Sequence, residues 1–229
     1  LGLPPGAGLF AFYDAAGDRA LLFGTGGPLS QDVWALTLSG TVAWSLLPSS
    51  GVLPSTRFGA SVELDPITHR LVLHGGTPDG AETWALSLGP IPEWSRVNGP
   101  APGRIYPSVV ADPVGDQMIV FGGGPVDLGQ SVNETWLRAF GGAELWSPVA
   151  TSGTKPSARH GHSAIVDPLS HRMIVFGGAA PFALGDTWGL ELDGTPAWSP
   201  LAPSGTQPAA RVHHSAIYDP VGARMVVFG

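Results

Sequence analysis

The sequence has 229 residues and a formal net charge of −7, with eighteen acidic side chains, eleven basic ones and no cysteine. With a single lysine, Lys155, and no basic run, it does not favour binding to duplex nucleic acid through phosphate neutralisation. The lack of cysteine excludes disulfides and thiol catalysis, and no apolar run is long enough to cross a bilayer.

An internal repeat organises the whole sequence. The eight tryptophans fall into four pairs whose members are ten residues apart, and successive pairs follow at intervals of 50, 52 and 52 residues. A fixed period of this size is typical of repeat architectures, in which each copy is one supersecondary unit. The pairs are Trp34/Trp44, Trp84/Trp94, Trp136/Trp146 and Trp188/Trp198.

Each repeat contains four short apolar runs, which we call A to D. In the fourth repeat, run A is 163–167, run B is 172–177, run C is 187–192, and run D surrounds Trp198. Short runs of β-branched and aromatic residues bounded by Gly, Pro, Asp and Ser are typical of strands. Runs A and B are apolar almost throughout, as expected for strands that are buried on both faces. Each complete repeat is therefore predicted to form a four-stranded antiparallel sheet.

In chain order, the repeats predict four complete sheets and the first two strands of a fifth. They cover residues 9–50, 56–100, 103–152, 158–204 and 210–229. The first copy is degenerate, but Asp14, Arg19 and Trp34 keep the spacing of the later copies. The fifth copy opens at Arg211 and reaches Gly229, so it contains runs A and B alone. We expect the whole chain, residues 1–229, to form one domain that is part of a longer protein.

Polar residues recur at fixed positions of the repeat. In the second copy, Arg57 opens run A, Asp65-Pro66 separates runs A and B, Gly75-Gly76 closes run B, and Glu82 precedes the tryptophan of run C. Asp-Pro supplies a tight turn, because proline presets φ and aspartate can accept hydrogen bonds from the following backbone. Half of the eighteen acidic residues occupy such positions. We expect most charges in this chain to be structural.

This combination of arginine, diglycine, acidic residue and tryptophan resembles the kelch repeat of the galactose oxidase-like/kelch superfamily. The resemblance covers nearly the whole chain, from Phe10 to Gly229. It implies an all-β, kelch-type β-propeller, with four complete blades and two strands of a fifth around a central channel lined by strand A. Kelch propellers usually have six or seven blades, so we expect further blades from the same protein or from a partner to complete the ring.

Catalytic and cofactor signatures are few. The chain has no Gly-x-Ser-x-Gly motif, and the copper site of galactose oxidase requires a cysteine cross-linked to a tyrosine, which this chain cannot supply. We predict no catalytic residue, no metal and no cofactor here, and interpret the chain as a noncatalytic binding or scaffold module. The alternative is a propeller enzyme whose catalytic residues lie in other blades or in an appended domain.

Two polar substitutions distinguish the second repeat. Glu63 stands in run A where later copies have valine or isoleucine, and His74 stands in run B where they have phenylalanine. In the register that the turn suggests, Glu63 faces Val72 and His74 faces Ser61, so the two would be diagonal neighbours on one face. A buried carboxylate is costly unless it is paired. The pair is interpreted as a structural or channel contact, with a catalytic dyad as the alternative.

Binding residues are expected at one end of the propeller, where the B–C and D–A connections meet. The B–C loops vary in length, with five residues in 77–81, ten in 124–133 and seven in 179–185. Variable loops on a rigid scaffold are common binding sites, although drift between repeats would give the same spread. We therefore place a protein or glycan partner at this end. The candidate residues are Asp79, Asp127, Gln130, Asn133, Phe182, Tyr106, His160 and His213.

The composition also suggests a setting. Low lysine with abundant Gly, Ala and Pro favours a bacterial protein, and we expect it to be secreted or at the cell surface. No nucleic-acid partner and no membrane insertion are expected. Asn133-Glu134-Thr135 matches an N-glycosylation motif, but we interpret the match as accidental because Glu-Thr belongs to the repeat.

Overall fold

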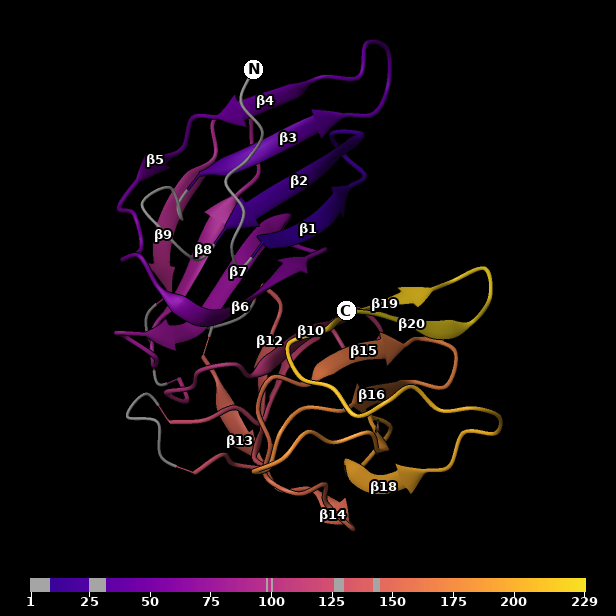
Figure 1. Cartoon of the computed structure of the whole chain (residues 1–229). Coiled ribbons are helices and arrows are strands. Elements are labelled where there is room, and N and C mark those ends of the chain that lie inside the picture. Colours follow the sequence, from indigo (N-terminus) through magenta and orange to yellow (C-terminus); the bar gives the residue numbers. More distant parts are fainter. Residues whose placement is uncertain (1–8, 25–31, 98, 100, 126–129, 142–144) are drawn as a thin grey trace.

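A computed structural model describes residues 9–24, 32–97, 99, 101–125, 130–141 and 145–229 (Figure 1). All regular elements in these residues are strands, and no helix among them could cross a membrane. The strands are β1 (Leu9–Asp14), β2 (Arg19–Gly24), β3 (Val33–Thr37), β4 (Trp44–Leu47), β5 (Ser50–Gly51), β6 (Phe58–Asp65), β7 (Arg70–Thr77), β8 (Thr83–Ser87), β9 (Glu93–Val97), β10 (Ser108–Asp112), β11 (Gln117–Phe121), β12 (Thr135–Ala139), β13 (Ser147–Val149), β14 (Ser152–Gly153), β15 (Ser163–Asp167), β16 (Arg172–Phe176), β17 (Thr187–Glu191), β18 (Ala197–Leu201), β19 (Ser215–Asp219) and β20 (Arg224–Phe228).

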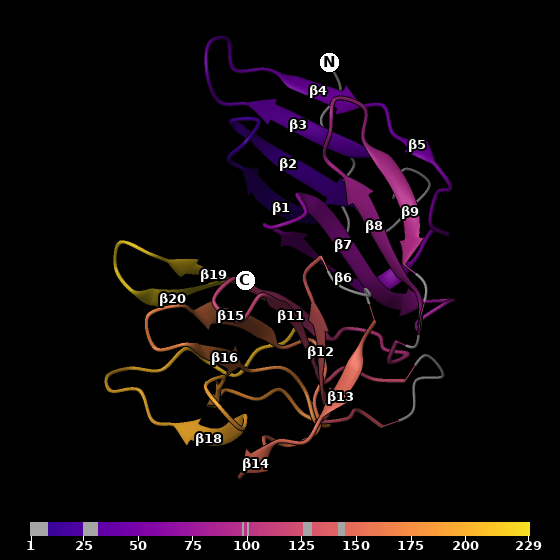
Figure 2. The same cartoon turned by 180° about the vertical axis from the view of Figure 1, so that it is seen from behind.

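The strands form five successive sheets, one for each repeat. Blade 1 has the order β1-β2-β3-β4 and blade 3 the order β10-β11-β12-β13, while blade 5 consists of β19 and β20. Blades 2 and 4 contain β6 to β9 and β15 to β18, and each has one further short strand. The predicted all-β fold of four complete blades and two strands of a fifth is confirmed. Figures 1 and 2 show the N-terminal blades in one half of the molecule and the C-terminal blades in the other.

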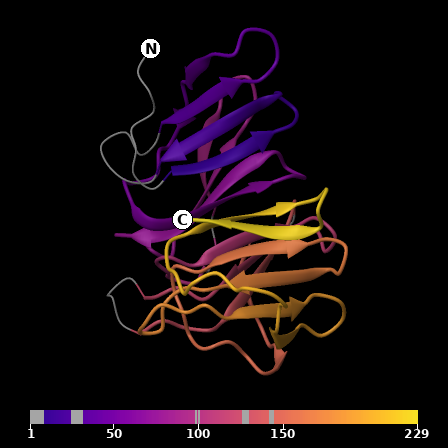
Figure 3. The ribbon, with the colours of Figure 1, turned by 45° about the vertical axis from the view of Figure 1, so that its right-hand side comes forward.

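The first strands of successive blades lie next to each other. β6 contacts β10, β10 contacts β15, and β15 contacts β19. Figure 3 shows the yellow hairpin of β19 and β20 running beside the orange strands of blade 4. Strand A is therefore the strand nearest the axis around which blades 2 to 5 are arranged, as the resemblance to the kelch repeat implies.

The short strands β5 and β14 change two expected sheet boundaries. The repeat boundaries predict Ser50 in the first sheet and Ser152 in the third, but β5 pairs in parallel with β9 and β14 with β18. These two D–A connections thus form an outer fifth strand on the following blade. Glycine permits this pairing, because a Cβ on Gly51 would lie 2.2 Å from the carbonyl oxygen of Trp94.

The A–B turns are fixed by their aspartates, as the Asp-Pro pattern predicts. In blade 2, Asp65 Oδ1 accepts hydrogen bonds from the amides of Ile67 and Thr68, both at 2.9 Å. In blade 1, Asp14 accepts a hydrogen bond from Arg19 at 2.7 Å. These carboxylates satisfy backbone and side-chain donors at one end of the blades, so they serve the fold.

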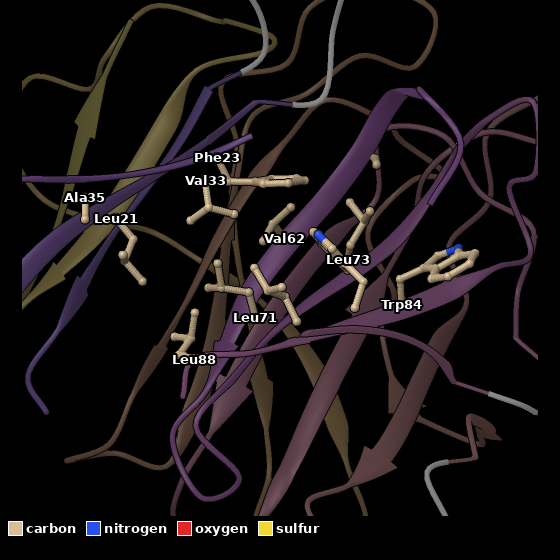
Figure 4. Packing of buried hydrophobic residues seen from close by; sticks show 12 residues of the cluster. Leu21, Phe23, Val33, Ala35, Val62, Leu71, Leu73, Trp84 and Leu88 are labelled. Atoms are coloured by element: carbon tan, nitrogen blue, oxygen red, sulfur yellow. The ribbon is translucent and has the colours of Figure 1, made fainter. Parts of the chain in front are cut away.

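The hydrophobic core lies between blades, and the tryptophans of strand D are central to it. The ring of Trp94 lies 5.5 Å from that of Phe23 in blade 1, and the ring of Trp198 lies 4.6 Å from that of Phe121 in blade 3. Aromatic pairs at these separations contribute about 0.5–1.5 kcal/mol beyond their buried area. Figure 4 shows the first interface, where side chains of blades 1 and 2 point toward one another, among them Leu21, Phe23, Val33, Val62, Leu71 and Leu73.

One face of blade 5 remains exposed in the described chain. Phe228 is 81% exposed, whereas its counterpart Phe176 is 4% exposed because blade 5 packs over it. Ile217 on the same hairpin is also exposed, while its counterpart Ile165 is buried. The total number of blades in the complete ring stays a prediction.

Candidate binding site at the channel mouth

A chain of backbone hydrogen bonds links four blades at the end where strand A begins. The amide of Tyr106 donates to the carbonyl of Gly59 at 2.6 Å, that of Gly161 to Tyr106 at 3.0 Å, and that of His213 to Gly161 at 2.8 Å. These four residues occupy the same repeat position, and all have positive φ, between 52° and 73°. We call this arrangement the mouth ring. It fixes the start of each A strand relative to the next.

Aromatic side chains alternate with glycines in the mouth ring. A Cβ on Gly59 would lie 3.2–3.3 Å from the ring of Tyr106, and one on Gly161 would lie 3.0 Å from the ring of His213. Each aromatic ring therefore lies over the glycine of the preceding blade. A left-handed backbone costs a residue other than glycine about 1–2 kcal/mol, so Tyr106 and His213 occupy strained positions. Such strain is concentrated at functional sites.

Four side chains form what we call the mouth cluster: Phe58, Tyr106, His160 and His213. The ring centroid of Tyr106 lies 4.4 Å from that of His213, 5.6 Å from that of Phe58 and 6.2 Å from that of His160. The two histidine rings are 6.4 Å apart. Phe58 is 63% exposed, so the cluster presents aromatic surface to solvent.

The mouth cluster presents aromatic surface and no carboxylate, lysine or arginine side chain. Burial raises the pKa of Tyr106, so its phenol is neutral at pH 7. Burial, with a contribution from the charge of His160, lowers the pKa of His213 below its usual value. Ser131 lies 2.8 Å from Nδ1 of His160 and fixes that ring. Exposed aromatic surface with a few polar atoms is typical of interface anchors.

Phe182 stands on a short loop beside the cluster. The backbones of His160 and Ala179 exchange two hydrogen bonds, at 3.2 and 2.9 Å, and Ala179 also pairs with Ala183. This narrow hairpin holds Phe182 at its tip, where the ring is 82% exposed. The structure thus connects three predicted site residues, His160, His213 and Tyr106, directly, and Phe182 through the hairpin base.

The remaining predicted site residues have other surroundings. The side-chain Nδ2 of Asn133 donates to the carbonyl of Pro156 at 3.0 Å, and the carboxylate of Asp79 accepts a hydrogen bond from the hydroxyl of Ser55 at 3.2 Å, so each residue links two loop segments. The interpretation of the glycosylation motif at Asn133 as accidental stays a prediction. Gln130 is exposed, and Asp127 lies outside the described residues. Sequence reasoning missed Ser131, because nothing in the repeat marks its contact with His160.

The arginines near the mouth are committed to the fold. Arg159 forms a bidentate pair with Asp186 at 2.7 and 2.9 Å and donates to the carbonyl of Gly177. The indole of Trp188 donates to the same carboxylate at 2.6 Å. Burial raises the pKa of Asp186, but the hydrogen bonds from Arg159 and Trp188 outweigh it and hold the pKa below its usual value. This clamp joins strands A, B and C of one blade.

Glu63 and His74 lie in the predicted register, but the structure does not join them. Glu63 is opposite Val72 and His74 is opposite Ser61. His74 Nδ1 lies 3.0 Å from Oγ1 of Thr83, and no hydrogen bond or ion pair connects it to Glu63 in the described part of the chain. Burial lowers the pKa of His74 to about 3 and raises that of Glu63 to about 8, so both are neutral near pH 7.

The repeat histidines connect neighbouring A strands. His162 Nε2 lies 2.9 Å from Oγ of Ser108, and His214 Nε2 lies 2.8 Å from Oγ of Ser163. They are structural, as their recurrence in the repeat suggested. Across the described residues, no group of three or more histidine, aspartate or glutamate side chains is placed to hold a metal ion.

These features define a β-propeller repeat protein. The blades are four-stranded and radial, blades 2 to 4 each contain an Arg–acid–Trp clamp, and tryptophans pack between the blades. The family model described as "KLHDC2/KLHL20/DRC7 Kelch-repeats domain" matches residues 13–229. The chain therefore belongs to the kelch-repeat family.

Similar proteins occur among eukaryotes. Host cell factor 1 of Homo sapiens is 32% identical over 158 residues, which cover 60% of this chain and 8% of that protein. Host cell factor 2 of Homo sapiens is 37% identical over 100 residues, covering 42% and 12%. Rab9 effector protein with kelch motifs of Bos taurus is 32% identical over 156 residues, covering 66% and 40%. The chain thus spans less than half the length of each of these relatives, and none of them supports the bacterial source expected from composition.

Proposed function

We propose that this propeller is a noncatalytic module that binds a protein partner at its channel mouth. The observation that carries the proposal is the mouth cluster, in which Tyr106 and His213 keep aromatic side chains at strained backbone positions. Phe58 and Phe182 add exposed rings beside them. Arg57, Arg104 and Arg159 at this end are engaged in ion pairs with acidic residues of their own blades, so the partner contacts mainly aromatic surface and polar loop atoms.

A protein is favoured over a glycan as the partner. One relative is named as a Rab9 effector, a description that involves another protein. The exposed faces of Phe58 and Phe182 suit apolar or aromatic side chains, which act as anchors in protein interfaces. A bacterial, secreted or cell-surface setting is proposed from composition alone. The site itself does not depend on that setting.

The test is affinity capture with matched surface variants. The mouth variant carries Phe58→Ser and Phe182→Ser, and the control carries Leu169→Ser and Val221→Ser, which are exposed apolar residues on the A–B turns. Captured proteins are identified by mass spectrometry, and a glycan array is run in parallel. We expect the wild type and the control to capture the same proteins and the mouth variant to lose them. Capture that survives the mouth variant but is lost by the control would place the interface at the other end.

A further inference from the structure

The seam between blades 3 and 4 carries three titratable side chains at the end where the A–B turns lie. Nδ1 of His171 lies 2.6 Å from Oδ1 of Asp193, and its Nε2 lies 3.2 and 3.1 Å from Oδ1 and Oδ2 of Asp112. Asp112 ends strand A of blade 3, whereas His171 and Asp193 lie on the A–B and C–D turns of blade 4. The imidazole therefore joins two blades, at the end opposite the mouth cluster.

Both ring nitrogens of His171 face carboxylates. An ionised carboxylate only accepts hydrogen bonds, and a neutral imidazole has one N–H, so a neutral ring can donate to only one of the two carboxylates. A protonated ring has two N–H groups and donates to both. The side chain of Asp112 has no exposed surface, so bulk water does not replace a lost contact there. The geometry therefore favours the imidazolium form of His171.

The buried carboxylate of Asp112 lacks the arginine that binds its counterparts. In blade 1, Arg19 donates to Asp14 at 2.7 Å, and in blade 5 the residues at the same two positions are paired at 2.9 Å. Blade 3 has Gln117 in place of the arginine, and its neutral amide donates to Asp112 at 2.9 Å. No lysine or arginine pairs with Asp112 in the described chain. Protonated His171 is therefore the cation beside a buried carboxylate that would be costly to leave without one.

The turn that carries His171 is set by the repeat. Its carbonyl accepts a hydrogen bond from the amide of Leu192 at 3.1 Å. The residue at this turn position has a left-handed backbone in all five blades, with φ between 44° and 53°. The five residues are Asp18, His69, Asp116, His171 and Ala223. The backbone is thus common to all blades, and the side chain is what distinguishes blade 4 from its neighbours.

Two carboxylates, those of Asp112 and Asp193, are the charged groups that face the imidazole among the described residues. Arg172 and Asp167, which flank the same turn, bind other groups. The hydrogen bond with Asp193 is the main cause that raises the pKa of His171 above its usual value of 6.5, burial opposes the rise, and Asp112 adds to it. The folded state therefore binds this proton more tightly than the unfolded chain does. Its stabilising contribution is complete below about pH 6.5 and is lost as the pH rises through the folded-state pKa.

We propose that His171 is a pH-sensitive latch between blades 3 and 4. When it is protonated, it binds Asp112 of blade 3 and Asp193 of blade 4 at the same time. When it loses the proton at higher pH, one carboxylate loses its imidazole donor and this end of the seam loosens. The latch lies away from the mouth cluster and does not rest on the proposed function.

The seam between blades 1 and 2 provides a comparison within the same molecule. His69 occupies the turn position of His171, and its Nε2 lies 2.8 Å from Oδ1 of Asp14. Arg19 binds the same carboxylate through Oδ2. A permanent cation therefore remains beside Asp14 when the imidazole is neutral, so this seam should depend less on pH.

The first experiment follows the carbon-bound ring protons of His171 by NMR across neutral pH, with His171→Gln for assignment. We expect a titration midpoint above 6.5. Asp193 is 81% exposed, so Asp193→Asn leaves the core untouched and should lower the midpoint by about 0.5 pH unit. Gln117→Arg should also lower it, because the arginine neutralises Asp112. A wild-type midpoint at or below 6.5, or one that neither variant moves, would overturn the proposal.

The second experiment measures the seam itself by hydrogen exchange at pH 6.5 and pH 8.5, with rates corrected for intrinsic exchange. The amide of Leu192 is bonded to the carbonyl of His171, and its protection should fall about threefold or more at the higher pH. The amide of Leu88 is bonded to the carbonyl of His69 at 3.2 Å, which makes it the matched control, and its protection should change less. Equal changes at the two amides would contradict the latch.

Two substitutions should exchange the behaviour of the two seams. Gln117→Arg supplies blade 3 with a permanent cation, so protection at Leu192 should no longer fall as the pH rises. Arg19→Gln removes the permanent cation from blade 1, so a loss of protection should now occur at Leu88. Both results together support the latch. A loss at Leu192 that persists in Gln117→Arg would show that the proton on His171 does not hold the seam, and would overturn the proposal.

Discussion

The indole nitrogen of Trp146 donates a hydrogen bond to Oγ1 of Thr83 at 3.0 Å, across the seam between blades 2 and 3. His74 binds the same oxygen through Nδ1, and its ring lies 5.2 Å from that of Trp146. In the neighbouring seams, Trp94 and Trp198 pack on phenylalanine rings instead. At the strand-D tryptophan, the seam between blades 2 and 3 therefore has a hydrogen bond where the two neighbouring seams have an aromatic contact.

We predict that His74→Phe makes the protein more resistant to acid. Burial lowers the pKa of His74 to about 3 in the folded state, against about 6.5 when unfolded. Between these values the unfolded chain binds the extra proton, so wild-type stability falls as pH falls through this window. At pH 5 the variant should avoid a loss of about 2 kcal/mol.

The measurement is urea unfolding of both proteins at pH 7 and pH 5. His162 has a similarly lowered pKa and is present in both proteins, so the difference isolates His74. Thr83→Val is a second variant for the same measurement. It removes the hydroxyl oxygen that His74 and Trp146 share, and it leaves every titrating group in place. If wild type and His74→Phe lose the same free energy of unfolding between the two pH values, His74 is not the buried neutral histidine described here.

Glu63 should make the free energy of unfolding change with pH in the opposite direction to His74. Burial raises its pKa to about 8, above the usual value of 4.5, so the folded state binds more protons than the unfolded state between these values. The free energy of unfolding should therefore fall as pH rises from 4.5 to 8. Glu63→Gln should flatten this part of the profile, and Glu63→Val, which restores the residue of blade 3, should also raise stability at pH 7. Parallel pH profiles for wild type and Glu63→Gln would contradict the assignment.

The repeat made most of the fold predictable, because it encodes local information. Apolar runs and Asp-Pro turns specify strands and their register, which is why the pairing of Glu63 with Val72 was predictable. Contacts between repeats were not. Thr83, which bonds His74, also accepts a hydrogen bond from Trp146, 63 residues further along the chain. The mouth ring depends on the positive φ angles of its residues, which the repeat pattern does not specify. In such cases the sequence indicates a functional position only through a departure from the repeat, such as Tyr106 where other copies have Gly59 and Gly161.

The strain in the mouth ring predicts different costs for two substitutions at one position. Tyr106 has a φ of +52°, so Tyr106→Gly should be more stable than Tyr106→Ala by about 1 kcal/mol, because glycine adopts this conformation without a Cβ penalty. Both variants should lose the partner captured at the mouth. Chemical unfolding gives the stability difference, and the capture assay gives binding. Equal stability of the two variants would mean that the backbone at this position is not strained.

The last prediction uses two arginines at the same position of different blades. Arg159 is fully buried and binds Asp186 bidentately, so Arg159→Ala removes the positive charge from that carboxylate and leaves it the hydrogen bond from Trp188. We expect a loss of about 3 kcal/mol in the free energy of unfolding. Arg211 is more exposed and, in the described chain, contacts backbone carbonyls alone. Arg211→Ala should cost less than about 1 kcal/mol. Urea unfolding of both variants at pH 7 gives the comparison, and similar losses would show that the clamp contributes little beyond its carbonyl bonds.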